Sequence, residues 1–423
     1  MVETPTAANS EGFRCSIGLA TGTMMNSINT SAGNATPCGQ QPRAGRLALG
    51  TNAKSSPPPS LKARRSIRYQ ALTVARMWAT ARAGAPSKAN PYPLNKYRVS
   101  KCMYVNHGDV GVMRSIAHGT SHYKGLTTCG SVWACPVCAA KIQERRRAEI
   151  VRAIDWAKQV GLTPVMVTFT FPHQSFHRLS DMLARQADAF KMLRKGGNWD
   201  KLKESVGYAG LIRSLEITYG ENGWHPHTHE IWFLKTPKVL SEARLTALWG
   251  NACRKAGLLT EDPVQFAAFN RHSVDVRIAD DTAGEYLAKQ DNSRAWGVAD
   301  EIAKATSKAG RKSGIHPHHF LVRHAEGDRE LYIEYIEAMK GKRQIFWSHG
   351  LKAVVGVDDV SDEEIAESTE DAADLLGLLS PDDWKIIRGN DARAEVLDAA
   401  EKGGWKAVEA LLSALRFDHG TVG

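Results

Sequence analysis

Three histidines at alternate positions form the pattern in this chain with the clearest chemical potential. His225, His227 and His229 lie in a stretch that ends in a mostly apolar run up to Leu234. Side chains two residues apart project from the same face of an extended strand, so the three imidazoles would lie side by side. Imidazoles in this arrangement can bind one divalent metal ion. The alternative is a histidine-rich turn that binds no metal.

A predicted hairpin adds a carboxylate to the same face. The Asn-Gly pair just before the histidines is typical of a tight turn between two strands. With residues 221–222 as the loop, Glu216 faces His227, and with residues 222–223 as the loop it faces His229. Directly opposed residues share a face in both registers. A mixed set of imidazoles and a carboxylate suits Mg²⁺, Mn²⁺ or Zn²⁺, and the alternative is that Glu216 only neutralises a protonated histidine.

A tyrosine and a lysine further along the chain could supply a nucleophile. Tyr286 and Lys289 are three residues apart in a helix predicted over residues 282–290, so they share a helix face. A metal ion with open positions can polarise a phosphate oxygen. A tyrosine phenolate can form a covalent phosphodiester, and a neighbouring lysine can position the phosphate. This spacing is common by chance and gains meaning only beside the histidines.

A cysteine cluster predicts a second metal site. Cys135 and Cys138 form a C-x-x-C, the short chelating loop of tetrahedral zinc sites. Cys129 is the predicted third ligand and Cys102 the fourth. Three histidines compete for the fourth place, namely His107, His118 and His122. The alternatives are a redox pair and plain core thiols, but clustering among seven cysteines in a reducing compartment favours metal ligands.

The elements around the histidines alternate in a recognisable order. Hydrophobic periodicity predicts strands and helices in the order β-α-β-β-α-β, over residues 164–171, 178–195, 209–219, 223–234, 241–256 and 274–278. This order predicts an α+β fold with a ferredoxin-like antiparallel sheet and helices on one face.

Composition divides the chain of 423 residues into four segments. They are a disordered tail over 1–60, a basic helix and zinc-binding region over 61–160, a sheet domain over 161–352, and an acidic and then helical tail over 353–423. Residues 85–100 are predicted to be a linker, and helix is predicted over 372–416.

The chain is basic, with a formal net charge of +10. This charge favours a polyanionic partner such as nucleic acid or an anionic membrane surface. No apolar run reaches the roughly 18 residues of a membrane span, and the N-terminus lacks the pattern of a secretory signal. We therefore expect a cytoplasmic protein without a membrane partner.

Together, these motifs resemble those of the HUH endonucleases, and in order and spacing those of the single-tyrosine replication initiators of rolling-circle plasmids. The His-Pro-His-Thr-His stretch is similar to their histidine motif, residues 168–171 to their first motif, and Tyr286 with Lys289 to their nucleophile motif. The cysteine stretch up to Cys138 and residues 341–352 extend the resemblance, which covers about residues 100–352.

The resemblance implies a nickase that depends on Mg²⁺ or Mn²⁺ and acts on its own origin DNA, at a single-stranded nick site beside a duplex or hairpin binding site. Tyr286 would become linked to the 5′-phosphate, leaving a 3′-OH primer for the host helicase and polymerase, and a second transfer would close the displaced circle. His227 and His229 would bind the metal with Glu216 or His225 as third ligand.

The resemblance implies that Lys289 assists Tyr286 as a base or phosphate contact. It also directs attention to basic side chains as DNA contacts, namely Arg64, Arg65, Arg145, Arg146, Lys342 and Arg343.

Two residues depart from the pattern of that family. Thr228 is less hydrophobic than the usual residue between the two histidines. Thr282 stands where some members carry a glutamate that activates water at termination, so the termination residue stays open, with Glu285 and Asp281 nearby.

Other classes of protein share some of these residues. An HUH-type transposase would use the same chemistry on other DNA. A zinc-bearing DNA-binding regulator would have structural histidines and no need of Tyr286. A zinc deaminase is disfavoured because its His-x-Glu precedes its cysteines. A second His-Pro-His, at residues 316–318, lacks a preceding strand with an acidic partner and is predicted to be a loop.

Overall fold

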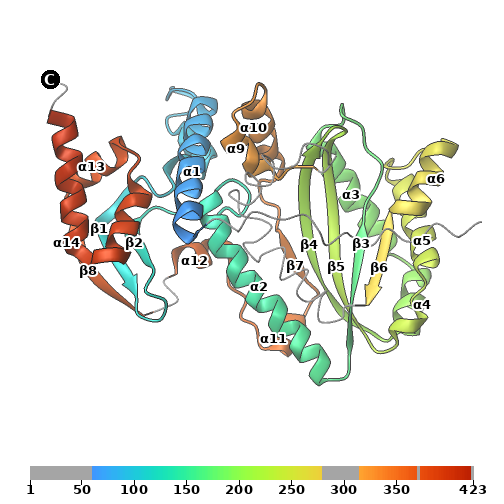
Figure 1. Ribbon diagram of the computed structural model, residues 1–423. Helices are drawn as coiled ribbons and strands as arrows, with labels where there is room; N and C mark the ends of the chain where they lie inside the picture. The colour runs from blue at the N-terminus through green and yellow to red at the C-terminus, as the bar shows by residue number, and fades with distance from the viewer. Residues whose placement is uncertain (1–59, 279–313, 369–371, 421–423) are drawn as a thin grey trace, which may run out of the picture. The chain divides into compact units, whose positions relative to one another are not determined.

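The computed structural model describes residues 60–278, 314–368 and 372–420. In these residues the fold is a mixed α+β architecture with two antiparallel sheets (Figure 1). The predicted tail, except Ser60, lies outside the described residues. So do the predicted helix over 282–290 and its candidate residues, namely Asp281, Thr282, Glu285, Tyr286 and Lys289.

The larger sheet contains the histidine strand. Its strands are β3 (Thr163–Phe169), β4 (Tyr208–Gly220), β5 (Gly223–Leu234), β6 (Val274–Ile278) and β7 (Ile345–Trp347). Their order across the sheet is β6-β3-β5-β4-β7, and all neighbours are antiparallel. The first four strands occur where the sequence predicted them, and the short β7 adds an edge that the sequence did not predict.

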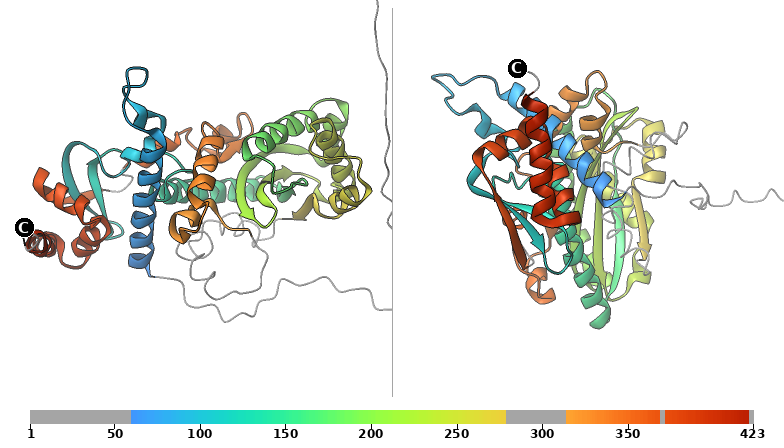
Figure 2. Two further views of the ribbon diagram at one scale, coloured as in Figure 1. Left: turned by 90° about the horizontal axis from the view of Figure 1, so that it is seen from above. Right: turned by 60° about the vertical axis from the view of Figure 1, so that its left-hand side comes forward.

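Helices α3 (Leu179–Leu193) and α5 (Glu242–Lys255) pack on one face of this sheet (Figures 1 and 2). Between them lies an aromatic core in which the ring of Phe169 meets the edges of Phe190 and Trp249 at centroid distances of 5.4 and 5.2 Å. Two shorter helices complete this side of the chain, α4 (Gly197–Val206) and α6 (Pro263–His272).

On the opposite face, two of the described helices pack against one end of the sheet. Helix α2 (Pro136–Gln159) and the short α11 (Leu351–Val355) bury Ile231 and Phe233 in a second core. Because residues two apart share a strand face, this is the face that also carries His225, His227 and His229. Among the described residues, the second core ends at Ile231, before the histidines.

The smaller sheet has the order β2-β1-β8 and lies beside the C-terminal helices (Figure 1). It consists of β1 (Asn106–Ser115), β2 (Ser121–Leu126) and β8 (Ala373–Leu379), with α1 (Leu61–Ala83), α13 (Pro381–Gly389) and α14 (Arg393–Gly420) nearby. The remaining short elements are η1 (Pro93–Lys96), η2 (Arg98–Lys101), η3 (Pro237–Val239), η4 (Pro317–His319), α9 (Phe320–Arg323), α10 (Asp328–Ala338) and α12 (Asp362–Glu367).

Two sequence predictions are wrong in this region. The helix predicted over 372–416 begins instead with β8, which pairs with β1. At Gly377 a Cβ would lie 2.3 Å from the ring of Trp405, so only glycine allows α14 this close to the strand. The linker predicted over 85–100 contains η1 and η2, and it buries Tyr97 and Val99. None of the described helices is both long enough and apolar enough to cross a lipid bilayer.

Candidate functional site

The hairpin that presents the histidines has a defined register. Gly220 pairs with Gly223, which leaves Glu221 and Asn222 as the two-residue loop. Gly223 has a φ of 79°, a conformation that favours glycine. This register sets Glu216 directly opposite His227, so the structure selects one of the two alternatives that the turn allowed.

Glu216 lies between two imidazoles. One of its carboxylate oxygens is 2.9 Å from His229 Nε2, and the other is 4.0 Å from His227 Nε2. On the far side of the His229 ring, Nδ1 lies 3.0 Å from the Thr168 hydroxyl. A partner on the second ring nitrogen is the arrangement that fixes the tautomer of metal-binding histidines. Two imidazoles and one carboxylate therefore lie side by side on the histidine face of the hairpin.

His225 is placed differently from the other two histidines. Its ring lies 4.3 Å from that of His227 and 4.5 Å from that of His173, by centroids. Burial, and then the two neighbouring rings, lower the pKa of His225 to about 3, so this imidazole is neutral. His225 thus packs within a row of rings, whereas Glu216 contacts His227 and His229.

His173 is a member of this cluster that the sequence did not predict. It lies in the loop after β3, and its Nδ1 donates to the Asn222 carbonyl oxygen at 3.0 Å. Burial lowers the pKa of His173. No alternating pattern marks this residue, and the only signal in the sequence is its position just after the strand 164–171.

The opposite face of β5 explains why Thr228 is tolerated in the histidine motif. Thr228 is buried, and its hydroxyl accepts a hydrogen bond of 3.1 Å from the Gln186 amide on α3. Beyond it, the fully buried Glu230 accepts from Arg213 at 2.7 Å and from Arg194 at 2.5 Å. A buried carboxylate needs such partners, so polar residues on this face are matched inside the protein.

The four predicted cysteines come together in a buried cluster. The sulfur atoms of Cys102, Cys129, Cys135 and Cys138 all lie within 4.8 Å of one another. Three of the separations are 3.5, 3.6 and 3.8 Å. Tetrahedral zinc with Zn–S bonds of about 2.3 Å sets sulfurs about 3.8 Å apart. The cluster is therefore consistent with zinc, and His107, His118 and His122 are not part of it.

Local structure places each sulfur. Cys135 caps the start of α2, where its sulfur accepts from the backbone N–H of Cys138 at 3.3 Å. Cys102 follows η2, and Cys129 follows β2. Burial raises the pKa of the Cys135 thiol, and hydrogen bonds from the other three cysteines lower the pKa of Cys138. Among the described residues, this is the one group that brings three or more such ligand atoms within 4.8 Å of one another. The histidine cluster does not bring three of its described ligand atoms this close together.

The cysteine loop is joined to the histidine hairpin by the segment that contains the second His-Pro-His. This segment forms the buried turn η4, in which His318 Nε2 lies 2.6 Å from the Trp133 carbonyl oxygen. The Trp133 indole N–H donates to the Lys342 carbonyl at 2.7 Å. Trp133 also meets the edge of the Tyr335 ring, and Tyr335 stacks on Trp224 of β5. A continuous packed path thus links the two clusters.

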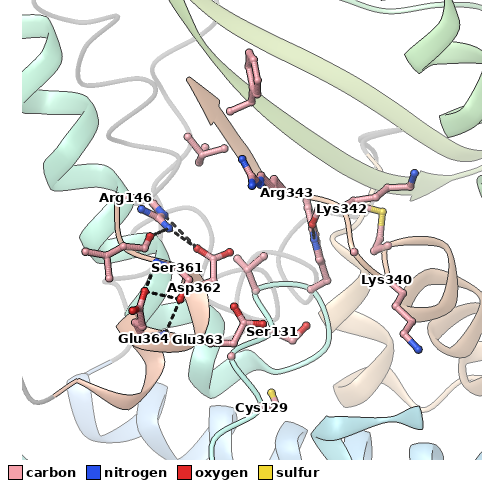
Figure 3. A pocket seen from close by; sticks show the side chains of 18 of the residues that line it. Cys129, Ser131, Arg146, Lys340, Lys342, Arg343, Ser361, Asp362, Glu363 and Glu364 are labelled. Carbon is pink, nitrogen blue, oxygen red and sulfur yellow. Dashed lines mark hydrogen bonds and ion pairs between the residues drawn. The ribbon is translucent and has the colours of Figure 1, made fainter. Parts of the chain in front are cut away.

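A cleft of about 1440 Å³ opens beside the cysteine loop. Figure 3 shows Lys340, Lys342 and Arg343 on one side and the acidic turn around Asp362 on the other. Arg146 is paired with Asp362 at 2.8 Å and with Glu149 at 2.9 Å. The charges on the acidic side are therefore partly neutralised within the protein, while the three basic residues on the other side are exposed.

The predicted DNA contacts fall into two groups. Lys342 and Arg343 are exposed in the cleft. In contrast, Arg65 is bound by Asp398 at 2.6 Å and by Glu401, which join α1 to α14. Arg146 is held in the ion pairs described above, and Arg145 lies 3.5 Å from Glu149. Arg64 is half-buried on α1.

Comparison with known proteins decides the family. The profile of the Rep_1 family, described as replication protein, matches residues 124–378, more than half of the chain. The chain belongs to the Rep_1 family. This Rep_1 protein is 30% identical to "Protein rep" of Streptomyces lividans over 368 residues, which is 70% of this chain and 75% of the relative.

A second relative matches a smaller part of the Rep_1 protein. A "Neomycin resistance protein" of Streptomyces cyanogenus is 36% identical over 150 residues, 29% of this chain and 34% of the relative. No solved structure matches the chain at a significant level.

Exchange of a cluster cysteine tests the metal. Cys135→Ser is expected to lower the zinc content from near one per chain to near zero, because serine is a poor ligand for zinc in a sulfur site. Plasma emission spectrometry of the dialysed protein measures this content. The matched control is Cys253→Ser, since Cys253 is equally buried but lies on α5 outside the cluster. An unchanged zinc content in Cys135→Ser contradicts the assignment.

Proposed function

We propose that this protein initiates rolling-circle replication of a plasmid by nicking one strand of its origin DNA. The observation that carries the proposal is the placement of Glu216 opposite His227 and beside His229. Two further observations support it. The strands β6-β3-β5-β4 have the order and antiparallel pairing expected of the split βαβ in an HUH nuclease, and the Rep_1 family consists of replication proteins.

Glu216, His227 and His229 are the proposed holders of Mg²⁺ or Mn²⁺. These side chains offer two imidazole nitrogens and a carboxylate, a donor set that such an ion accepts, and the Thr168 hydroxyl contacts the second ring nitrogen of His229. When bound, the metal ion would polarise a phosphate oxygen at the scissile bond. His225 is the weaker candidate for third ligand because its ring packs between His173 and His227.

Tyr286 is the proposed nucleophile. Its phenolic oxygen attacks the phosphorus of a phosphodiester in single-stranded DNA, and the bond from phosphorus to the 3′-oxygen breaks. The phenol loses its proton and the leaving 3′-oxygen gains one, so the step is a transesterification that consumes no water. Lys289 assists by contacting the phosphate or the phenolate. The linked 5′-phosphate is later transferred to another 3′-OH, which closes the displaced circle.

Other residues serve the proposed function by binding DNA. The exposed cations Lys342 and Arg343 contact phosphates of the origin beside the nick site. The four cysteines hold a zinc ion that fixes the start of α2, the helix that packs on the histidine face of the sheet. The freed 3′-OH then serves host helicase and polymerase in strand synthesis.

The test is formation of a covalent adduct. The purified protein is incubated with Mn²⁺ and a labelled single strand from the origin of its own plasmid, and the products are separated under denaturing conditions. We expect a protein–DNA adduct, with the label retained only when it is 3′ of the nick. A purely regulatory DNA-binding protein would bind the strand and give no adduct, which would refute the proposal.

A further inference from the structure

An exposed aromatic side chain lies on the loop that borders the histidine cluster. Phe176 follows β3 and exposes 78% of its surface. Its ring contacts that of His177 edge-on at a centroid distance of 4.6 Å. Arg178, two residues after Phe176, is also exposed. An exposed aromatic ring can stack on a planar ligand, and Arg178 adds a positive charge.

The loop over residues 172–177 is held against the hairpin. His173 donates to the Asn222 carbonyl in the turn, and its ring faces His225. Ser175 lies so close to Gly223 that a Cβ there would be 2.9 Å from the Ser175 Cα. Within the loop, His177 Nδ1 accepts from the backbone N–H of Gln174 at 3.0 Å. Phe176 is therefore presented by a loop that two contacts fix to the strand ends beside the proposed nick site.

We propose that Phe176 is the platform of a base-binding subsite, on which one nucleobase of the single-stranded substrate stacks next to the scissile phosphate. Arg178 would contact the adjoining phosphate, and His173 is the positioning residue that fixes the loop to the hairpin. Stacking on an aromatic ring is tolerant of sequence because every base has a flat face. This subsite rests on the proposed function, since it assigns the nucleobase to the DNA strand that the proposed nickase cleaves.

The experiment compares two phenylalanines with the same exposure. Phe417, at the end of α14, also exposes 78% of its surface but is remote in sequence from the loop. The affinity of Phe176→Ala, Phe176→Trp and Phe417→Ala is measured by fluorescence anisotropy without divalent metal. The probes are a labelled oligothymidine and an abasic strand of the same length, which carries the phosphates without the bases.

We expect Phe176→Ala to bind oligothymidine about 5-fold or more weakly than the wild type. Phe176→Trp should restore binding and Phe417→Ala should leave it unchanged. On the abasic strand, Phe176→Ala and the wild type should be equal, because the bases that stack are missing. Equal affinities on oligothymidine, or the same loss on both strands, would overturn the subsite, as would failure of the wild type to bind oligothymidine.

The adduct assay separates this inference from the proposed function. If the wild type forms the covalent adduct but Phe176→Ala binds oligothymidine as the wild type does, the subsite is wrong and the nickase stands. If the wild type forms no adduct while Phe176→Ala loses affinity only for the strand with bases, the nickase is wrong and the base platform stands.

Discussion

Tyr286→Phe is expected to abolish the covalent protein–DNA adduct while leaving the affinity for origin DNA unchanged. The exchange removes only the phenolic oxygen, which is the atom proposed to attack phosphorus. Water can hydrolyse a phosphodiester but cannot attach the DNA to the protein. Loss of a covalent nucleophile lowers turnover by on the order of a thousandfold or more. Denaturing gel analysis of the labelled strand measures the adduct, and anisotropy measures binding.

A second tyrosine provides the matched control for this exchange. Tyr92 is 71% exposed, and Tyr92→Phe removes the same oxygen from the surface of another part of the chain. This variant should form the adduct at the rate of the wild type. If the adduct persists in Tyr286→Phe, the nucleophile is another residue, and the metal assignment can still be tested separately.

The histidine hairpin could be predicted from the sequence because every signal needed is local. Alternation of His225, His227 and His229 fixes a strand face, and the nearby turn residues fix a hairpin. The exact loop could not be predicted, since both registers keep Glu216 on the same face. Pairing of Gly220 with Gly223 decides it.

Contacts between residues that are far apart in the chain could not be predicted from the sequence. Arg65 and Arg146 read as exposed cations, but their carboxylate partners Asp398 and Asp362 lie 333 and 216 residues away in the chain. In the same way, Cys102 could be proposed as a ligand but not preferred over three histidines. Only the folded chain brings it to the C-x-x-C.

The error at residues 373–379 has a different cause. A short apolar run with little alternation fits a helix or a buried strand equally well. Pairing with β1 decides the outcome, because β1 offers a partner edge that the sequence alone did not reveal. His173 was missed since a single histidine in a loop carries no periodic signal.

His227→Ala combined with His229→Ala is expected to abolish metal-dependent cleavage and leave binding to duplex DNA largely intact. The exchange removes both imidazole ligands and leaves Glu216 as a single carboxylate, which is too weak a site to hold Mg²⁺ or Mn²⁺ in place. A metal that stabilises the transition state by about 4 kcal/mol accounts for about a thousandfold in rate.

The adduct assay with Mn²⁺ measures cleavage, and calorimetric titration with Mn²⁺ measures binding of the ion. The control is His107→Ala combined with His118→Ala, two exposed histidines in β1 and in the turn after it, which should nick and bind Mn²⁺ as the wild type does. Cleavage that persists without His227 and His229 would place the metal elsewhere, whereas loss of Mn²⁺ binding together with cleavage would tie the histidine end of β5 to the chemistry.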